Sequence, residues 1–144
     1  MTILTILRMN NSKTGTYQPI PQETELIGRR TLDAAFKVHS ALGPGLLEGV
    51  YEKALAYELN KQRIMVERQK RIPIKYDDQI LESGFFCDLL IDQRVIVELK
   101  AVATINPIFH AQLLTYLRLS GIRLGYLINF NTIHLKDGIK RMVL

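Results

Sequence analysis

The sequence predicts an α/β domain in which helices cover a mixed β-sheet. Apolar residues recur at three- and four-residue spacing over 26–42 and 47–63, which is typical of amphipathic helices. After residue 64 the spacing changes, first to the alternation of a half-buried strand and then to continuous apolar runs. The predicted order is helix, helix, three strands, helix and strand, with strands at 72–76, 85–91, 94–101 and 124–130 and the third helix at 106–120.

Local signals set the ends of several of these elements. Gly43-Pro44-Gly45 ends the first predicted helix. Asn106 is the expected N-cap of the third helix, and Gly121 is its expected stop. Asp77-Asp78 provides a turn after the first strand, and Pro73 places that strand at a sheet edge or at a bulge.

The connections predict how the strands pair. The two apolar runs at 85–91 and 94–101 follow each other closely, so they should form an antiparallel hairpin buried on both faces. The helical crossover after residue 101 allows the strand at 124–130 to lie parallel to a neighbour. A short last strand is expected over 139–144. The sheet is therefore predicted to be mixed, with the hairpin strands at its centre.

Length and composition fit a single domain. The chain has 144 residues, of which 47% are hydrophobic, so it can bury a core without a disulfide or a structural metal. Residues 8–22 are polar, contain Gly15, Pro19 and Pro21, and show no sustained period. We therefore expect residues 1–22 to form a loose N-terminal arm and residues 23–144 to form the domain.

Charge and cysteine content narrow the expected partners and compartment. Lys and Arg outnumber Asp and Glu by 19 to 14, and the net charge of +5 favours a polyanionic partner without naming one. The single cysteine, Cys87, excludes an intramolecular disulfide and is expected in a reducing compartment, as a small core residue. The apolar run at 1–7 is too short for a membrane helix and lacks the features of a secretory signal. A cytoplasmic protein without a membrane partner is expected.

Three ionisable residues interrupt the two central strands. Asp88 lies in Phe-Phe-Cys-Asp-Leu-Leu-Ile, and Glu98 and Lys100 lie in Val-Ile-Val-Glu-Leu-Lys-Ala. Buried charges usually need a partner or a metal. Glu98 and Lys100 share a face because strand side chains alternate. Asp88 joins them if residues 92–94 form a three-residue turn, whereas a two-residue turn would direct Asp88 to the opposite face.

This set of side chains suits one kind of chemistry. Two converging carboxylates favour a hard divalent cation such as Mg²⁺ or Mn²⁺. Such an ion can polarise a phosphoryl oxygen, and a neighbouring lysine can orient the attacking water and offset developing charge. The pattern indicates phosphodiester hydrolysis. An ordinary ion pair of Glu98 and Lys100 at a strand end, with Asp88 capping a turn, is the alternative, and spacing alone leaves both interpretations open.

Further motifs extend over most of the chain. They are Gly45-Leu-Leu-Glu48-Gly-Val-Tyr51, Gln69-x-x-Ile72-Pro-Ile-x-Tyr76, His110-Ala-Gln112, Gln112-Leu-Leu-Thr-Tyr116 and Gly125-Tyr-Leu-Ile-Asn-Phe130. Together with the Asp88 and Glu98-Leu-Lys100 strands, they resemble the GxxExxY protein family, a small bacterial and archaeal group in the PD-(D/E)XK nuclease superfamily. The resemblance runs from about Leu26 to Val143.

This resemblance implies a restriction-endonuclease-like core. Asp88 and Glu98 would ligate Mg²⁺ or Mn²⁺, and Lys100 would assist the nucleophile. Glu48 is similar to the extra acidic residue that the first core helix supplies as a metal ligand in some branches of the superfamily. Gln112 begins a Gln-x-x-x-Tyr element that resembles the one lining the site of helicase-associated exonucleases, and is included among the catalytic candidates.

The expected function is metal-dependent hydrolysis of phosphodiester bonds in nucleic acid, with DNA favoured over RNA and a homodimer left open. The alternative is a catalytically silent module on the same fold that binds nucleic acid or a protein partner. Metal binding distinguishes the two functions, because the nuclease needs Asp88 and Glu98 to share a cation and the silent module does not. Tyr51 and Tyr116 are expected to pack in the core rather than to react.

Overall fold

The computed structural model describes residues 18–144, apart from the side chains of Glu82 and Ser83. Its elements are α2 (Gln22–Leu42), α3 (Glu48–Lys61), β1 (Val66–Tyr76), β2 (Gln79–Ile91), β3 (Val95–Lys100), α4 (Pro107–Ser120), β4 (Leu124–Asn129), the short 3-10 helix η1 (Leu135–Gly138) and β5 (Ile139–Val143). This is the predicted order. Asn106 caps α4 as expected, accepting a hydrogen bond from the Ile108 N–H at 3.0 Å, and Gly121 ends the helix with a φ of 74°.

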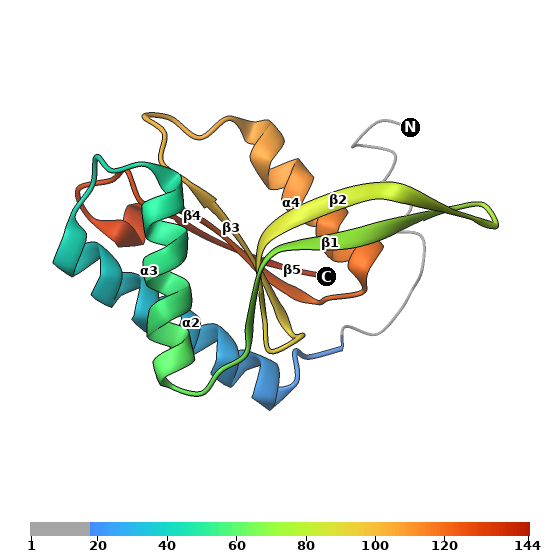
Figure 1. Cartoon of the computed structure of the whole chain (residues 1–144), viewed down its shortest axis with the longest axis horizontal. Coiled ribbons are helices and arrows are strands. Elements are labelled where there is room, and N and C mark those ends of the chain that lie inside the picture. The colour runs from blue at the N-terminus through green and yellow to red at the C-terminus, as the bar shows by residue number, and fades with distance from the viewer. Residues whose placement is uncertain (1–17) are drawn as a thin grey trace.

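The strands form one five-stranded sheet in the order β1-β2-β3-β4-β5. β3 and β4 are parallel and are connected by α4, whereas the other neighbours are antiparallel, so the prediction of a mixed sheet is confirmed. Pro73 lies in the edge strand β1 at a register shift between Ile72 and Ile74, where its missing N–H does least harm. The β1–β2 hairpin extends well beyond the rest of the sheet (Figure 1).

Helices cover both faces of the sheet, with α2 and α3 on one side and α4 on the other (Figure 1). Two hydrophobic cores result. Val95, Val97 and Leu99 of β3 belong to the core beneath α2 and α3, whereas Ile96 belongs to the core beneath α4. Because strand side chains alternate, Glu98 and Lys100 follow Ile96 toward the α4 side.

The turn between β2 and β3 fixes the register of the two central strands. Ile91 pairs with Val95, and Leu89 pairs with Val97, so residues 92–94 form the predicted three-residue turn. Asp92 and Gln93 adopt positive φ values of 52° and 58° within it. This register places Asp88 opposite Glu98, as the sequence required for the two carboxylates to meet.

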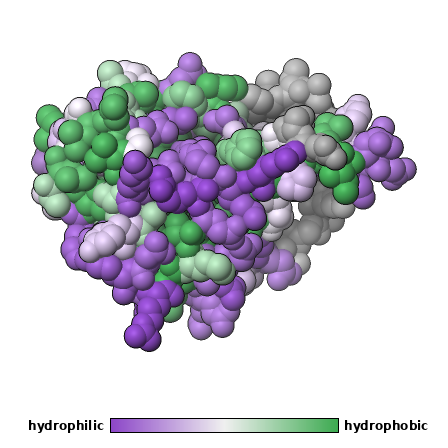
Figure 2. All heavy atoms as spheres, in the orientation of Figure 1, coloured by the Kyte–Doolittle hydropathy of each residue, from purple (hydrophilic) through white to green (hydrophobic). Residues whose placement is uncertain are grey.

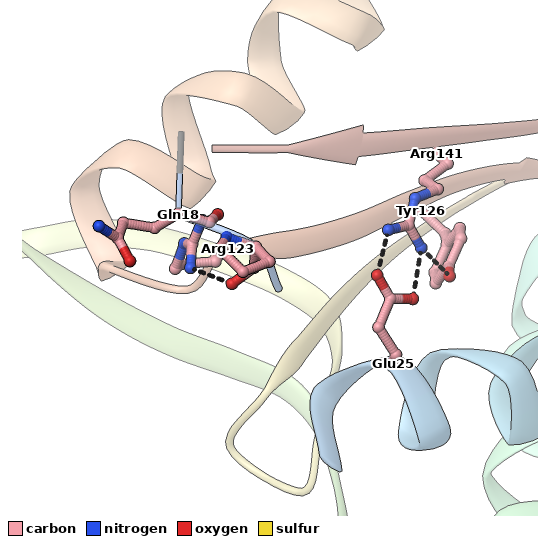
Figure 3. A network of polar contacts seen from close by, with 6 residues as sticks. Gln18, Glu25, Arg123, Tyr126 and Arg141 are labelled. Carbon is pink, nitrogen blue, oxygen red and sulfur yellow. Dashed lines mark hydrogen bonds and ion pairs between the residues drawn. The ribbon is translucent and has the colours of Figure 1, made fainter. Parts of the chain in front are cut away.

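The N-terminal boundary differs from the prediction. The helix α2 begins at Gln22, and Ile20 is buried, so the last residues assigned to the loose arm belong to the domain. The Arg123 guanidinium holds this segment by donating hydrogen bonds to the backbone oxygens of Gln18 and Pro19 (Figure 3). Arg123 Nε also donates to the Leu144 oxygen at 3.0 Å. The rest of the predicted arm, residues 1–17, lies outside the described residues.

A bidentate ion pair ties the start of α2 to the last strand. Both terminal nitrogens of Arg141 in β5 donate to the Glu25 carboxylate, and one of them lies 3.3 Å from the Tyr126 hydroxyl (Figure 3). The hydrogen bond from Arg141 holds the pKa of Glu25 below its usual range. Two parallel hydrogen bonds give this pair a defined geometry, which fixes α2 against β4 and β5.

The surface is mixed in polarity. Hydrophobic side chains gather at the end of the molecule where α2 ends and α3 begins (Figure 2). Among them are Leu47, which is 81% exposed, and Leu42 and Val50. None of the helices within residues 18–144 combines the length and apolar character needed to cross a membrane.

Candidate active site

Asp88 and Glu98 lie next to the last pair of the β2–β3 ladder, Leu89 with Val97, on the side away from the turn at residues 92–94. The Asp88 N–H donates to Glu98 Oε1 at 3.0 Å, and the Leu99 N–H donates to Asp88 Oδ2 at 2.8 Å. Side-chain carboxylates therefore replace backbone carbonyls as the acceptors between the strands at this point. The arrangement holds both carboxyl groups close together and fixes one oxygen of each.

Glu98 is the more buried of the two carboxyl groups, with 5% of the residue exposed. Burial and then the Asp88 charge raise the pKa of Glu98 to about 8, while the hydrogen bond from the Asp88 N–H and the charge of Lys100 act in the opposite direction. A raised pKa means that the site disfavours two negative charges at once. A cation bound between the carboxylates would remove this penalty.

Lys100 stands two residues beyond Glu98 on β3. Its ammonium lies 4.3 Å from the centroid of the Phe109 ring, which α4 supplies. A cation over an aromatic face is attracted by the ring quadrupole, so Phe109 gives the flexible lysine a preferred position. The Lys100 charge lowers the pKa of Glu98, although burial and the Asp88 charge outweigh it. The role of Lys100 in catalysis stays a prediction.

Glu48 reaches the same region from the first position of α3. Burial and then the Asp88 charge raise the pKa of Glu48, while the Lys100 charge lowers it. Contacts on both sides of Glu48 explain the Gly-x-x-Glu-x-x-Tyr spacing. Gly45 adopts a φ of 99°, and the buried Tyr51 hydroxyl donates to the Gly43 oxygen at 2.6 Å and accepts from the Leu46 N–H at 3.1 Å.

The donor set fits a divalent cation held by few protein ligands. In the part of the chain that the structure describes, no group of three or more His, Cys, Asp and Glu side chains is arranged to hold a metal ion. Glu48 as a third ligand therefore stays a prediction. Mg²⁺ is commonly bound by one or two carboxylates, with water and substrate phosphates completing its shell. Asp88 and Glu98 meet that requirement.

Helix α4 forms the wall of the site on the side of Lys100. The Tyr116 ring stacks on Phe85 of β2, with centroids 3.9 Å apart and planes 6° apart. Burial and then the charges of Glu98 and Asp88 raise the pKa of Tyr116, whereas the neighbouring Gln112 side chain lowers it. Tyr116 therefore packs as predicted, and the Gln-x-x-x-Tyr element borders the carboxylates. The role of Gln112 in catalysis stays a prediction.

Two residues near Asp88 have contacts for which the sequence suggested no role. Gln69 of β1 donates a hydrogen bond from Nε2 to Asp88 Oδ1 at 3.1 Å and another to Glu52 Oε2 at 3.0 Å. Glu52 of α3 is buried and also accepts from Arg68 Nε at 3.2 Å. A signal for Glu52 exists in the sequence, because residues four apart such as Glu48 and Glu52 share a helix face.

Cys87 and Tyr51 behave as the sequence predicts. Both are fully buried, and Tyr51 stacks on Phe130 with ring centroids 4.5 Å apart. Burial and then the charges of Glu98 and Asp88 raise the pKa of the Cys87 thiol to about 12. A thiol that stays protonated is a poor nucleophile and a poor metal ligand, so Cys87 is a core residue.

The chain matches a known family over most of its length. A family model described as the PD-(D/E)XK nuclease superfamily matches residues 25–142. No curated protein matches the chain, and no solved structure matches it either. The match supports the superfamily and its restriction-endonuclease-like fold, while the narrower GxxExxY group stays a resemblance.

Proposed function

Because the chain belongs to the PD-(D/E)XK nuclease superfamily, we propose that it is a metal-dependent nuclease that hydrolyses phosphodiester bonds in nucleic acid. DNA is the favoured substrate over RNA. The observation that carries the proposal is the pair formed by Asp88 and Glu98, which the β2–β3 register brings together with Lys100 beside them. Spacing alone could not distinguish a catalytic pair from a structural one, and the family match favours the catalytic interpretation.

Each residue has a defined task in this proposal. Asp88 and Glu98 would hold Mg²⁺ or Mn²⁺, since carboxylate oxygens are the ligands that these ions prefer and the backbone hydrogen bonds already orient both groups. When bound, the ion supplies Lewis-acid polarisation of the phosphate and lowers the pKa of a water molecule. Glu48 adds negative charge from α3 and is proposed to complete the ligand set through water or directly.

Lys100 acts on the reacting groups rather than on the fold. Its ammonium, positioned over Phe109, orients the attacking water and donates to a phosphate oxygen as negative charge develops there. The water oxygen loses a proton to solvent and forms a bond to phosphorus, the bond from phosphorus to one sugar oxygen breaks, and the leaving oxygen takes up a proton from solvent, so the products are a phosphomonoester and a sugar hydroxyl. Gln112, which lies beside Tyr116 on α4, is proposed to line the site and to contact the substrate.

A cleavage assay tests the proposal. Purified protein is incubated with single- and double-stranded DNA and RNA in Mn²⁺, and parallel samples contain EDTA. We expect cleavage that needs Mn²⁺ and is lost in Asp88→Asn, because the asparagine removes one negative charge from the ligand pair at almost unchanged shape. Asp92→Asn is the matched control, since Asp92 lies in the nearby turn, where it pairs with Arg94 at 3.2 Å.

The outcomes separate this function from the alternative. Full cleavage by Asp88→Asn would place the activity elsewhere or in a contaminant. Absence of cleavage of all four substrates with Mn²⁺ would reject the nuclease. Binding of nucleic acid without cleavage and without Mn²⁺ uptake would favour the catalytically silent module.

A further inference from the structure

Gln69 has an unusual backbone for a residue inside a strand. Its φ is 49°, which non-glycine residues seldom adopt outside turns. The β1–β2 register runs from Arg68 opposite Leu89 to Lys70 opposite Cys87, which places Gln69 opposite Asp88. An irregular conformation at this position, next to a candidate ligand, is the kind of local strain that clusters at functional sites.

The Gln69 side chain connects two carboxylates. Its Nε2 donates one hydrogen bond to Asp88 Oδ1 and one to Glu52 Oε2. Ionised carboxylates only accept hydrogen bonds, so the NH₂ group must face them and the amide orientation is determined. Gln69 thus uses both of its side-chain hydrogens in this bridge.

Glu52 is a firm anchor for the bridge. Only 6% of the residue is exposed, and its second oxygen accepts from Arg68 Nε at 3.2 Å. A buried charge with two donors has little freedom to rotate. The Gln69 amide is therefore held from the side of α3 and presented to Asp88.

The Asp88 carboxylate is consequently fixed at both oxygens. Gln69 donates to Oδ1 and the Leu99 N–H donates to Oδ2. Each oxygen keeps a lone pair for another partner, and the rotation of the carboxylate is set by the two donors. Replacing an outer group that orients a metal ligand in this way typically weakens metal binding by about 10- to 100-fold.

From these contacts we infer that Gln69, backed by Glu52, is a positioning residue that orients Asp88 for a divalent cation. The inference rests on the proposed function, because it assigns Asp88 as a ligand. It goes beyond that function by naming a relay, a chain of hydrogen bonds from Glu52 in α3 through Gln69 in β1 to Asp88.

Calorimetric titration with Mn²⁺ tests the relay. Gln69→Met keeps the length of the side chain but removes both donors, and we expect the Mn²⁺ dissociation constant to rise by about 10- to 100-fold. Cleavage should recover largely at saturating Mn²⁺, because the substituted residue does not touch the reacting atoms. Equal Mn²⁺ affinity of Gln69→Met and wild type would overturn the inference.

A matched control distinguishes an effect on the metal site from a general effect of removing a glutamine at a strained backbone position. Gln93 also has a positive φ, of 58°, and its side chain also donates to a glutamate, Glu67, but it lies in the β2–β3 turn. Gln93→Met should leave the Mn²⁺ affinity unchanged. If both variants lower the melting temperature equally and neither changes Mn²⁺ affinity, Gln69 is only structural and the inference is wrong.

A double-mutant cycle tests the order of the relay. Glu52→Gln keeps one acceptor oxygen for two donors, so it should weaken Mn²⁺ binding less than Gln69→Met does. Because Glu52 acts through Gln69, the double variant should bind Mn²⁺ as the single Gln69→Met does. Additive losses would refute the relay. Wild-type protein that binds no Mn²⁺ would instead reject the proposed function, and this inference with it.

Discussion

The Asp88 N–H donates to the Glu98 carboxylate at 3.0 Å, so the two acidic residues are joined by a hydrogen bond as well as opposed by their charges. The contact lies just beyond the last backbone pair of β2 and β3, Leu89 with Val97, where the Glu98 side chain takes the place of a backbone acceptor. The same contact lowers the pKa of Glu98, but burial and the Asp88 charge outweigh it. In the metal-free protein, the site is therefore a source of instability.

Glu98→Gln should make the metal-free protein more stable at high pH. Below the unfolded pKa near 4.5, Glu98 is protonated in both states. Between that value and the folded pKa of about 8, only the unfolded chain loses the proton, so stability falls as pH rises and then stays low. Glutamine resembles the protonated carboxyl group and does not ionise. The substitution should therefore remove much of the decrease in the free energy of unfolding, a gain of several kcal/mol at high pH.

Thermal unfolding in EDTA between pH 5 and pH 9 measures this difference. Some pH dependence should persist in Glu98→Gln, because the raised pKa of Glu48 contributes with the same sign. Glu58→Gln is the control, since the hydrogen bonds from Lys37 and Lys61 lower the pKa of Glu58 and the substitution should bring no gain. Parallel melting curves for wild type and Glu98→Gln would show that the burial of Glu98 has no such cost.

Tyr51→Phe should destabilise the loop that presents Glu48. The ring can keep its stack on Phe130, but the Gly43 oxygen and the Leu46 N–H lose their shared partner. We expect a loss of about 1–2 kcal/mol in the free energy of unfolding, measured by urea titration. Tyr57→Phe on the same helix, where the side chain is 62% exposed, should change stability by less than about 0.5 kcal/mol.

The meeting of Asp88 and Glu98 could be predicted because strand alternation and turn length suffice to fix it. Once residues 92–94 are assigned to the turn, the period of two decides which side chains share a face. The roles of Asn106 and Gly121 at the two ends of α4 could also be predicted, since helix ends have specific residue preferences.

The role of Gln69 could not be predicted in the same way. Its place opposite Asp88 depends on the β1–β2 register, and the alternating pattern is visible only from Ile72 onward. The positive φ of Gln69 also breaks the alternation that a strand prediction assumes. The start of α2 at Gln22 could not be predicted for a related reason. Its first residues carry few apolar side chains, and the helical spacing of apolar residues begins only at Leu26.

Phe109→Leu should slow cleavage without changing Mn²⁺ affinity. The leucine keeps an apolar contact but removes the ring face on which the Lys100 ammonium lies at 4.3 Å. A cation–π contact of ~0.5–2 kcal/mol corresponds to a rate decrease of about 2- to 30-fold at saturating Mn²⁺. Phe109→Tyr keeps the ring and should retain the wild-type rate. Equal rates for the leucine and tyrosine variants would show that the ring does not position Lys100.

Glu98→Ala and Lys100→Met should separate metal binding from catalysis. Glu98→Ala removes a ligand and a negative charge, so Mn²⁺ binding should weaken and cleavage should disappear together. Lys100→Met keeps most of the side-chain length but removes a cation near the carboxylates, so Mn²⁺ should bind at least as well as in wild type. Cleavage should nevertheless fall by about 10²-fold or more, the loss expected when one transition-state donor is removed.

Lys140→Met controls for the lost charge in this pair of measurements. Lys140 is an exposed residue of β5, so its replacement lowers the net charge of the protein equally without touching the site. It should keep both Mn²⁺ affinity and cleavage rate. Because Lys100 is assigned to the reacting water and phosphate and not to the metal, its variant must lose rate while it keeps Mn²⁺. If Lys100→Met cleaves as fast as Lys140→Met, the proposed role of Lys100 is wrong, and Lys100 then has only a structural role over the Phe109 ring.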